Sequence, residues 1–541
     1  MRAARRSWSS RPTPRSRPRS STASSGSTAS PRAARSRSSP LVVFQVYPRS
    51  FADADGDGEG DLEGIRRRLG HIASLGCDAL WLSPIFPSPM ADGGYDVADF
   101  EGVDPRFGTV QDAQRLIDDA HAHGLRVLLD LVPCHTSIEH PWFREHPERY
   151  VWSGVDGPAN NWRSTFGGPA WSPDPHGRGR GWYLHSFYAE QPDLDWRHPD
   201  VAPAVGAAIA TWRARGVDGF RLDALDRLLK DPQRRDDPPA HGPPPLPEGF
   251  ADVRALEHRH SRNAPDIATA LAQLRAAAGD DAFLVGEVYL PSRRLGPYLE
   301  HLDTCFAFEL LHAPWTAASV RRAIAEAVAA APGERMSWVL SNHDFPRLPD
   351  RVGREQVRAA ALLLLSLPGH VFVFQGDELG LADGPGSSQP DRRASDTCRP
   401  DRCQTPAGYD RAGRDPHRHP IPWEAGAPHA GFTTGEPWLA VAEAPDGPVD
   451  VQARDPTSML GLYRRLIAAR RDLRGPLELL DAADGVVAFT RGAHVVAVNV
   501  SAEAQPAPRA GAIVVHTDAP EPGGPAPTTL VPGEGFVASR I

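Results

Sequence analysis

Acidic, histidine and arginine side chains recur at the ends of short apolar runs in this chain. The set comprises Asp130 and His135, Arg221 and Asp223, Glu287, and His343 and Asp344, from four separate runs. A single acid at the end of a strand is more often a cap for the following helix than a catalytic group. Several acids that meet at one place would crowd negative charge, so their convergence indicates a functional site.

Two of these acids have the neighbours that cleavage of a glycosidic bond requires. Arg221 lies two residues before Asp223, so in a strand both side chains point to the same face. We expect the arginine to lower the pKa of Asp223 and keep it an ionised nucleophile. We expect like-charge neighbours to raise the pKa of Glu287, which makes it the proton donor. Such paired carboxylates predict glycoside hydrolysis.

Eight apolar runs alternate with amphipathic helical patterns and would position these groups. The runs cover residues 41–47, 79–84, 126–132, 219–225, 283–289, 303–310, 337–344 and 371–378. They are apolar on both faces, as parallel strands covered by helices are. Helical patterns lie between them, for example at 61–76 and 110–124. The alternation predicts an α/β protein with a (β/α)8 TIM barrel, in which the strand ends share one mouth.

Two stretches depart from a simple barrel. Residues 133–199 follow the third strand, have no helical period and predict an insertion domain, which divides the barrel into 41–132 and 200–473. Residues 474–541 alternate in polarity and predict a C-terminal all-β domain. Residues 1–40 are almost wholly Arg, Ser, Pro, Ala and Thr, which predicts a disordered tail. An export signal at Arg5–Arg6 is the alternative, but no apolar region follows it.

Composition excludes several classes of protein. A formal charge of −9 argues against nucleic acid as the main partner. No apolar run has the length of a membrane span, so we expect no membrane partner. Five cysteines in so long a chain do not form a disulfide framework, and the pair Cys398 and Cys403 lacks a second pair to complete a metal site. We therefore expect a cytoplasmic protein, whose oligomeric state the sequence leaves open.

A series of motifs resembles one enzyme family along most of the chain. They are FQVYPRSF (44–51), GDLEGI (60–65), GGYDVADF (93–100), DLVPCHTS (130–137), FGGPAW (166–171), QPDLDW (191–196), GFRLDAL (219–225), GEVYL (286–290), SNHDFPR (341–347) and QGDELG (375–380). In this order they resemble the retaining α-glucoside-acting family that contains the α-amylases. Within that family the bacterial α-glucosidases and oligo-1,6-glucosidases are the most similar.

The resemblance implies a role for each residue at a matching position. Asp223 would be the nucleophile, Glu287 the acid/base, and Asp344 a third acid that grips sugar hydroxyls. The residues expected to bind the glucose are His135, Arg221 and His343, with Tyr95 and Asp96 closing its far side, and Phe166 and Arg347 lining the pocket. Two departures from the family are Cys134 and Asp195, at positions where Asn is usual.

The resemblance also implies a substrate. Ala224 follows the nucleophile, and a small residue there accompanies α-1,4 action, whereas Val accompanies α-1,6 action; the difference is worth about 1–3 kcal/mol. We expect an exo-acting α-glucosidase that hydrolyses terminal glucose from maltose and short malto-oligosaccharides. The alternatives are an oligo-1,6-glucosidase, or a trehalose-forming or sucrose-acting glucosyl transferase or isomerase. A non-catalytic binding subunit is a remote alternative, because such chains generally lose one of the three acids.

The stretch DADGDGEGD at 53–61 begins like a calcium-sensor loop. That pattern needs a bidentate Glu at position twelve, but position twelve is Gly64 and Glu63 falls one place early. In the resembling α-glucosidases this loop holds a structural Ca²⁺. The ligands would be the side chains of Asp53, Asp55, Asp57 and Asp61 and the backbone carbonyl of Glu59. The alternative is a solvated acidic turn without an ion.

Overall fold

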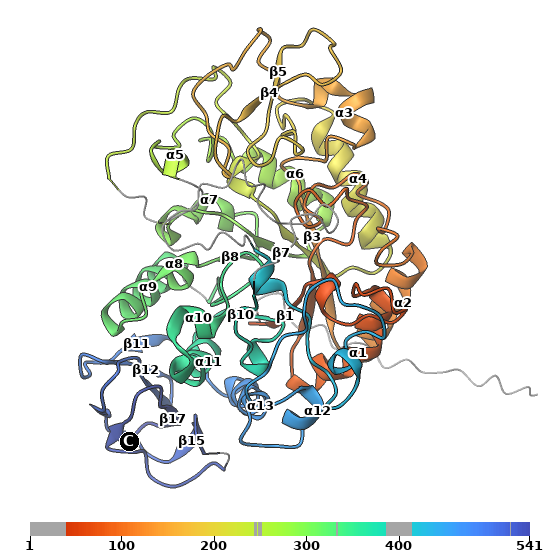
Figure 1. Ribbon diagram of the computed structural model, residues 1–541. Helices are drawn as coiled ribbons and strands as arrows, with labels where there is room; N and C mark the ends of the chain where they lie inside the picture. The colour runs from red at the N-terminus through yellow and green to blue at the C-terminus, as the bar shows by residue number, and fades with distance from the viewer. Residues whose placement is uncertain (1–38, 243–245, 247–250, 332–333, 386–413, 520) are drawn as a thin grey trace, which may run out of the picture. The chain divides into compact units, whose positions relative to one another are not determined.

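Eight parallel strands close into a barrel, which confirms the predicted fold class (Figure 1). In the computed structural model they are β1 (Val42–Val46), β2 (Ala79–Leu82), β3 (Arg126–Leu131), β6 (Gly219–Leu222), β7 (Phe283–Gly286), β8 (Thr304–Phe306), β9 (Met336–Trp338) and β10 (His370–Phe374). Their order around the barrel is β1-β10-β9-β8-β7-β6-β3-β2. Every predicted strand overlaps one of them.

The structure describes residues 39–242, 246, 251–331, 334–385, 414–519 and 521–541. Nearly all of the predicted N-terminal tail, and both Cys398 and Cys403, lie outside the described residues. Within the described ranges, no helix combines the length and the apolar character that crossing a bilayer requires.

The seventh predicted strand is shorter than the sequence indicates. β9 ends at Trp338, so His343 and Asp344 lie in the loop beyond it. The side chain of Asn342 accepts a hydrogen bond from the backbone N–H of Asp344 at 2.8 Å, which closes a local turn. Such a turn competes with strand pairing, and it places the two functional side chains at the mouth of the barrel.

Alternating side chains fill the barrel and attach it to its helices. Val43, Trp81 and Phe372 belong to one buried cluster with other inward-facing residues of the strands. Phe44 and Leu80, each next to one of these in sequence, belong to the larger cluster shared with the helices. This is the two-residue period of a strand with both faces buried.

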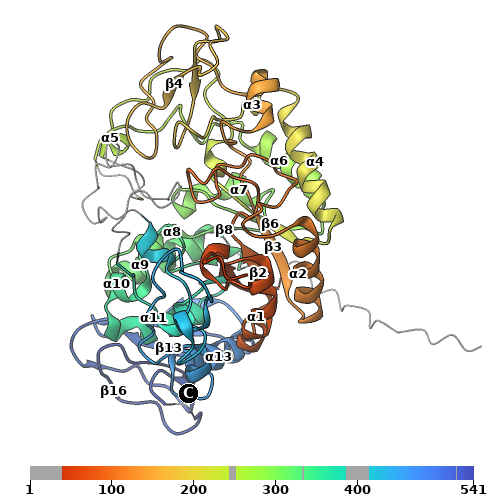
Figure 2. The ribbon, with the colours of Figure 1, turned by 45° about the vertical axis from the view of Figure 1, so that its right-hand side comes forward.

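Helices cover the outside of the barrel (Figures 1 and 2). Those of ten residues or more are α1 (Leu62–Leu75), α2 (Val110–Ala122), α4 (Val201–Ala214), α6 (Ala268–Ala278), α9 (Ala317–Ala330), α11 (Val357–Ser366) and α13 (Met459–Arg470). The shorter ones around the barrel are α5 (Ala251–Arg254), α7 (Gly296–Leu299), α8 (Phe308–His312), α10 (Leu348–Val352) and α12 (Val449–Gln452). The limits of α1 are set by its caps: the Asp61 side chain accepts the Gly64 N–H, and Gly76 ends the helix at φ 89°.

The chain between β3 and β6 leaves the barrel and returns to it. It contains α3 (Pro141–Glu145), β4 (Trp171–Pro173) and β5 (Trp182–Leu184), with a small core that includes Val151 and Trp162. On its return it pairs antiparallel with the segment after β3, through the bridge between His135 and Asp193. Figures 1 and 2 both draw β4 and α3 on the opposite side of the barrel from the C-terminal sheet.

The C-terminal part forms a five-stranded antiparallel sheet in the order β11-β12-β13-β17-β15, and a separate pair β14-β16. The strands are β11 (Leu477–Leu479), β12 (Val486–Arg491), β13 (His494–Asn499), β14 (Gln505–Pro506), β15 (Ile513–His516), β16 (Thr529–Leu530) and β17 (Gly535–Ser539). Helices α11 and α13 of the barrel pack against this sheet.

Candidate active site

One guanidinium group links three carboxylates at the mouth of the barrel. Arg221 Nη1 lies 2.8 Å from Asp130 Oδ1 and 2.5 Å from Asp223 Oδ1, and Nη2 lies 2.7 Å from Glu287 Oε1. Asp130 is on β3, Arg221 is on β6, and Asp223 and Glu287 directly follow β6 and β7. The side chain of Arg221 is 1% exposed, so these ion pairs are shielded from water.

Burial dominates the electrostatics of this cluster. It raises the pKa of Asp223 to about 6, although Arg221 acts to lower it. Burial also raises the pKa of Glu287 well above its usual range, and the charges of Asp223 and Asp344 act in the same direction. The expectation that Arg221 would lower the pKa of Asp223 below its ordinary value is wrong. The reason is that one shared cation does not offset the desolvation of three acids.

The backbone after the nucleophile candidate is strained. Ala224 has φ 45° and ψ 44°, in the left-handed region that residues other than glycine rarely occupy. In this conformation its N–H donates to Glu287 Oε2 at 3.1 Å, and the N–H of Leu225 donates to the Glu287 carbonyl at 3.1 Å. The turn therefore holds the Glu287 carboxylate next to Asp223, and strain of this kind is typical of functional sites.

Asp344 is held ionised on the other side of the cluster. Its Oδ1 lies 2.8 Å from Arg414 Nη1 and 3.3 Å from Arg418 Nη2, and its Oδ2 lies 3.3 Å from His343 Nε2. Burial opposes its ionisation, but His343 and the two arginines keep the pKa of Asp344 below its ordinary value. Asp130, Asp223 and Glu287 therefore have raised pKa values, whereas Asp344 has a lowered one.

The two histidines are neutral hydrogen-bonding groups. Burial lowers the pKa of His135 to about 4 and that of His343 to about 3. The ring of His343 stacks on Tyr95 at 5.2 Å between centroids, and its Nδ1 lies 2.8 Å from Gln45 Nε2. The Tyr95 hydroxyl donates to Asp130 Oδ2 at 2.9 Å, which connects this stack to the carboxylates.

Cys134, which stands at a position where the sequence resemblance predicts Asn, is packed without exposure to solvent. Its side chain is fully buried, and its Sγ lies 2.9 Å from Nδ1 of His135. On the other side of the ring, Nε2 of His135 lies 2.9 Å from Gln191 Nε2 and 3.1 Å from the Tyr95 carbonyl. The ring of His135 is therefore fixed from both edges.

Phe166 reaches this site from the insertion. Its ring stacks on Tyr188 at 4.2 Å, and the guanidinium carbon of Arg414 lies 5.5 Å from its centroid. Because Arg414 also pairs with Asp344, Phe166 lies beside the carboxylate cluster.

Asp96 was expected to face the bound glucose, but its carboxylate points into its own loop. Its carboxylate accepts hydrogen bonds from the Ser88 hydroxyl at 2.8 Å and from the N–H groups of Ala91 and Asp92 at 2.9 and 3.0 Å. Its side chain thus holds the shape of its own loop. Asp92 of the same loop is the acid that reaches the site, where it pairs with Arg414 Nη2.

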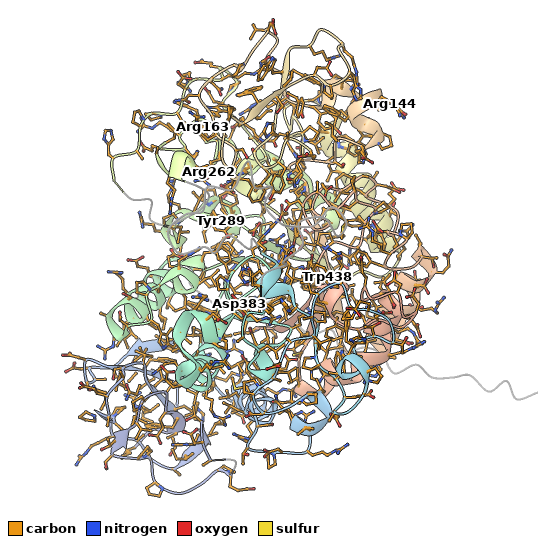
Figure 3. All side chains as sticks on the ribbon, viewed as in Figure 1. Arg144, Arg163, Arg262, Tyr289, Asp383 and Trp438 are labelled. Carbon is orange, nitrogen blue, oxygen red and sulfur yellow. The ribbon has the colours of Figure 1, made fainter. Side chains whose placement is uncertain are left out.

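Arg347 also lies away from the carboxylates. Its Nη1 donates to the carbonyl of Gln375 at 2.8 Å, and its guanidinium carbon lies 4.8 Å from the ring centroid of Phe374 at the end of β10. Its backbone N–H donates to Asp383, which is labelled in Figure 3. The prediction that Arg347 lines the pocket is therefore replaced by a role in packing the loop after β9 on β10.

Three site residues were missed from the sequence. Arg414 joins Asp92 to Asp344, and Gln191 Nε2 donates to Asp92 Oδ2 at 2.8 Å. The stretch Gly-Arg-Asp-Pro at 413–416 contains Arg414 and is the local sequence signal from which this residue could have been found. Nothing in the local sequence distinguishes Asp92 from Asp96, because the folded loop decides which of the two side chains points to the carboxylate cluster.

The acidic loop before α1 brings part of the expected calcium set together. Asp53, Asp55 and Asp61 each offer an oxygen, and these atoms lie within 4.8 Å of one another. Burial raises the pKa of Asp61, and the charges of Asp55 and Asp53 act in the same direction. The hydrogen bonds that its carboxylate accepts from backbone N–H groups act to lower the pKa but do not outweigh these effects. Three hard oxygen donors with mutual repulsion fit Ca²⁺.

Asp57 departs from the expected set, and the side chain of Glu59 has a separate partner. The Asp57 carboxylate accepts the backbone N–H of Glu59 at 2.8 Å and lies outside the group of three. The Glu59 side chain pairs with Arg49 at 3.3 Å, and the guanidinium of Arg49 lies 3.8 Å from the ring centroid of Trp438, labelled in Figure 3. Three of the four side chains expected as ligands therefore form the candidate cation site, and the Glu59 carbonyl stays a predicted ligand.

Comparison with known proteins agrees with this geometry. The family model "Alpha amylase, catalytic domain" matches residues 45–474. A probable alpha-glucosidase of Rhizobium meliloti is 39% identical over 489 residues, which cover 83% of this chain and 86% of the relative. An oligo-1,6-glucosidase of Parageobacillus thermoglucosidasius is 32% identical over 478 residues, covering 80% and 83%.

A solved structure extends the likeness to three dimensions. The crystal structure of the alpha-glucosyl transfer enzyme XgtA superposes with a TM-score of 0.82 at 34% identity, covering 93% of this chain and 99% of that one. With the barrel, the carboxylate cluster and these matches in place, the chain belongs to the α-amylase family of glycoside hydrolases.

Proposed function

We propose that this enzyme is a retaining, exo-acting α-glucosidase that hydrolyses terminal, preferentially α-1,4-linked glucose from maltose and short malto-oligosaccharides. The main observation is that Arg221 holds Asp223 and Glu287 on the two terminal nitrogens of one guanidinium. Carboxylates held this close leave little room for a water between them, which favours the double-displacement geometry of retaining enzymes.

The two acids divide the chemistry. Asp223, once ionised, attacks the anomeric carbon while Glu287 gives its proton to the glycosidic oxygen, so that the C1–O bond breaks and the leaving sugar departs. The Glu287 carboxylate then takes a proton from water, whose oxygen attacks C1 and releases Asp223. The raised pKa of Glu287 suits the proton donor, because an ordinary glutamate would already be ionised at neutral pH.

The neighbouring residues support action on terminal glucose. Asp92 and Asp344 share the guanidinium of Arg414, and these charged groups suit the bidentate binding of sugar hydroxyls at a closed end. The preference for α-1,4 linkages rests on Ala224, whose small side chain adjoins the nucleophile.

Product analysis tests this function. The protein is incubated separately with maltose, isomaltose, sucrose and trehalose, and the products are separated by chromatography. We expect glucose from maltose, and no glucose after Asp223→Asn or Glu287→Gln substitution. Glucose from isomaltose in preference to maltose would assign the oligo-1,6-glucosidase alternative. No product from any of the four would refute the proposal.

Glucosyl transfer is the second candidate, because a closely superposing structure is named an alpha-glucosyl transfer enzyme. In transfer a sugar hydroxyl replaces water in the second step, with the same acids. The ratio of released glucose to new disaccharides at rising maltose concentration separates the two. A ratio dominated by new disaccharides, or trehalose formed from maltose, would favour transfer.

We also propose that Asp53, Asp55 and Asp61 bind a structural Ca²⁺, which would neutralise their charge and fix the loop before α1. Chelation by EDTA should lower the melting temperature by a few degrees, and added Ca²⁺ should restore it, because an ion bound to the native state alone stabilises it. The Asp55→Asn variant should show a smaller response to EDTA. An unchanged melting temperature would favour a solvated turn without an ion.

A cytoplasmic location is proposed on the state of the cysteines. Cys77, Cys134 and Cys305 are buried free thiols, which suits a reducing compartment. Fractionation of the native host tests it, and recovery of the enzyme outside the cytoplasm would contradict it.

A further inference from the structure

Lys230 is exceptional in the composition of this protein. Of the 59 lysine and arginine residues in the sequence, it is the only lysine. It is also buried, with a side chain 6% exposed, in the loop that follows β6 and the 3-10 helix Leu225–Arg227. Lysine is rarely buried unless it is paired, so both the residue type and its place need a reason.

The ammonium group has a compact set of partners. Its Nζ lies 2.5 Å from Asp193 Oδ2 and donates to the carbonyl of Arg227. The Asp193 carboxylate also accepts the Ser186 N–H at 2.8 Å and the Ser186 hydroxyl at 2.5 Å. A guanidinium, with five donors in a rigid plane, would leave donors unpaired in this buried space. The geometry therefore selects lysine over arginine.

A second contact ties the same two segments together. The carbonyl of Lys230 accepts from Arg197 Nε at 3.2 Å and Nη2 at 3.0 Å. Arg197 is fixed in turn by Asp266, 2.6 Å from its Nη1. The return segment of the insertion, residues 191–197, is thus attached at two points to the loop after β6 that contains Lys230.

That return segment supports one wall of the active site. In this segment, Gln191 Nε2 lies 2.9 Å from His135 Nε2 and donates to Asp92 Oδ2 at 2.8 Å. Its backbone pairs with the chain after β3, since the Thr136 N–H donates to the Pro192 carbonyl and the Leu194 N–H donates to the Cys134 carbonyl. A shift at Asp193 would therefore move Gln191 relative to both of its partners.

We propose that Lys230 is a positioning residue for the sugar-binding wall: its ion pair with Asp193 holds Gln191 between His135 and Asp92. The inference rests on the proposed glucosidase activity of the same pocket. Lys230 touches none of the three candidate catalytic acids in the contacts described above, and it acts through the return segment.

Substitution measures the effect of the ion pair. Lys230→Met should lower kcat/KM for 4-nitrophenyl α-D-glucopyranoside about 10- to 100-fold, mainly by raising KM, because the buried Asp193 loses its charged partner. Lys230→Arg, although it keeps the positive charge, should lower kcat/KM as Lys230→Met does. If the methionine variant does not fold, Lys230→Gln and Asp193→Asn remove the ion pair while keeping hydrogen-bonding groups, and they should lower kcat/KM in the same way.

A remote ion pair provides the matched control. Arg275 pairs with Asp303 at 2.6 Å between α6 and the loop before β8, and both are largely buried. Arg275→Met should lower the melting temperature but leave kcat/KM unchanged. If Lys230→Met does the same, Lys230 has only a structural role and the inference is overturned.

A double-mutant cycle asks whether the effect passes through Gln191. In a Gln191→Ala background, the further change Lys230→Met should alter kcat/KM by no more than about 2-fold, because the positioned side chain is already gone. If the lysine substitution costs the same factor in both backgrounds, the two residues act independently and the proposal fails.

Hydrogen exchange gives a readout that does not need turnover. Lys230→Met should speed amide exchange at Thr136 and Leu194, whereas Arg275→Met should not. If the parent protein cleaves no glucoside, the proposed function fails, and the exchange result still decides whether Lys230 holds the return segment. Unchanged exchange at both amides would refute this part.

Discussion

At the scale of single residues, the site works by sharing charges. Arg221 serves Asp130, Asp223 and Glu287, while Arg414 serves Asp92 and Asp344. Sharing leaves the three acids around Arg221 only partly compensated, so burial decides the direction of their pKa shifts, whereas the cations around Asp344 outweigh its burial. The acids near Arg221 bind protons more tightly than usual, whereas Asp344 binds its proton less tightly.

The pH profile of kcat/KM should follow from this division. The working state has Asp223 ionised and Glu287 protonated, so activity should fall below about pH 6 as Asp223 gains a proton. It should fall again at high pH as Glu287 loses its proton, which makes the profile bell-shaped. In Glu287→Gln, residual activity on 4-nitrophenyl α-D-glucopyranoside should lose the alkaline limb only. An acid limb near pH 4 would show that Asp223 titrates as an ordinary aspartate.

Asp92, rather than Asp96, should determine sugar binding. Asp92→Asn should lower kcat/KM about 10- to 100-fold, chiefly through KM, because it removes the charge of an acceptor that we propose binds a sugar hydroxyl. Asp99→Asn, on the exposed end of the same loop, is the control and should change neither constant. Steady-state kinetics with maltose measures both. A normal KM for the Asp92 variant would place the terminal glucose elsewhere.

At the scale of elements, the short strands and the long loops of the barrel have different roles in positioning the site. No barrel strand exceeds six residues, and the two acids proposed for the reaction, together with Asp344, lie in the turns just beyond strand ends. The strands supply register, while turns such as the one at Ala224 aim the side chains. The packing of helices on the barrel then limits which turns can move.

Two glycines of α1 test that packing. A Cβ at Gly64 would meet the Ala52 carbonyl oxygen at 2.0 Å, whereas a Cβ at Gly70 would meet nothing within 4 Å. Gly64→Ala should therefore destabilise the fold by several kcal/mol. Gly70→Ala should raise the free energy of unfolding by about 0.5–1 kcal/mol, since alanine is the better helix former. Denaturant melts of the two variants measure this, and equal stabilities would contradict the packing.

At the scale of the whole described molecule, one buried arginine joins the barrel to its last helix, α13. Arg470 of α13 donates to the carbonyls of Leu365, Leu367 and Gly369, and burial lowers its pKa to about 9. These carbonyls belong to the end of α11 and the turn before β10. The same two helices pack on the C-terminal sheet, so Arg470 stabilises the base on which that sheet rests.

Arg470→Met should lower stability without changing the chemistry. Loss of the buried donors leaves three carbonyls without this partner, at a cost of about 2–5 kcal/mol. The melting temperature should fall by several degrees while kcat/KM stays unchanged. Arg471→Met, on the exposed face of the same turn, should change neither. Reduced kcat/KM in the folded Arg470 variant would show coupling between this helix and the pocket.

The sequence alone determined the barrel and most of the site. Strands and helices follow from local periodicity, and each of the eight apolar runs forms a barrel strand, because a doubly buried strand must be apolar throughout. The acids at the strand ends follow from the same register. The positions of Asp223 and Glu287, each directly after its strand, were therefore predictable as soon as the strands were, whereas Asp344 lies in a loop beyond the end of β9 that the strand pattern did not predict.

Tertiary structure decided what depends on distant partners. Arg414 reaches Asp92 across 322 positions of the chain, and no local pattern indicates which of two nearby acids will meet it. The direction of the Asp223 shift also depends on burial by residues from several strands, which outweighs the adjacent Arg221. Local sequence specifies which groups are present, but only the packed fold sets their distances and their exposure to water, and those quantities control their energies.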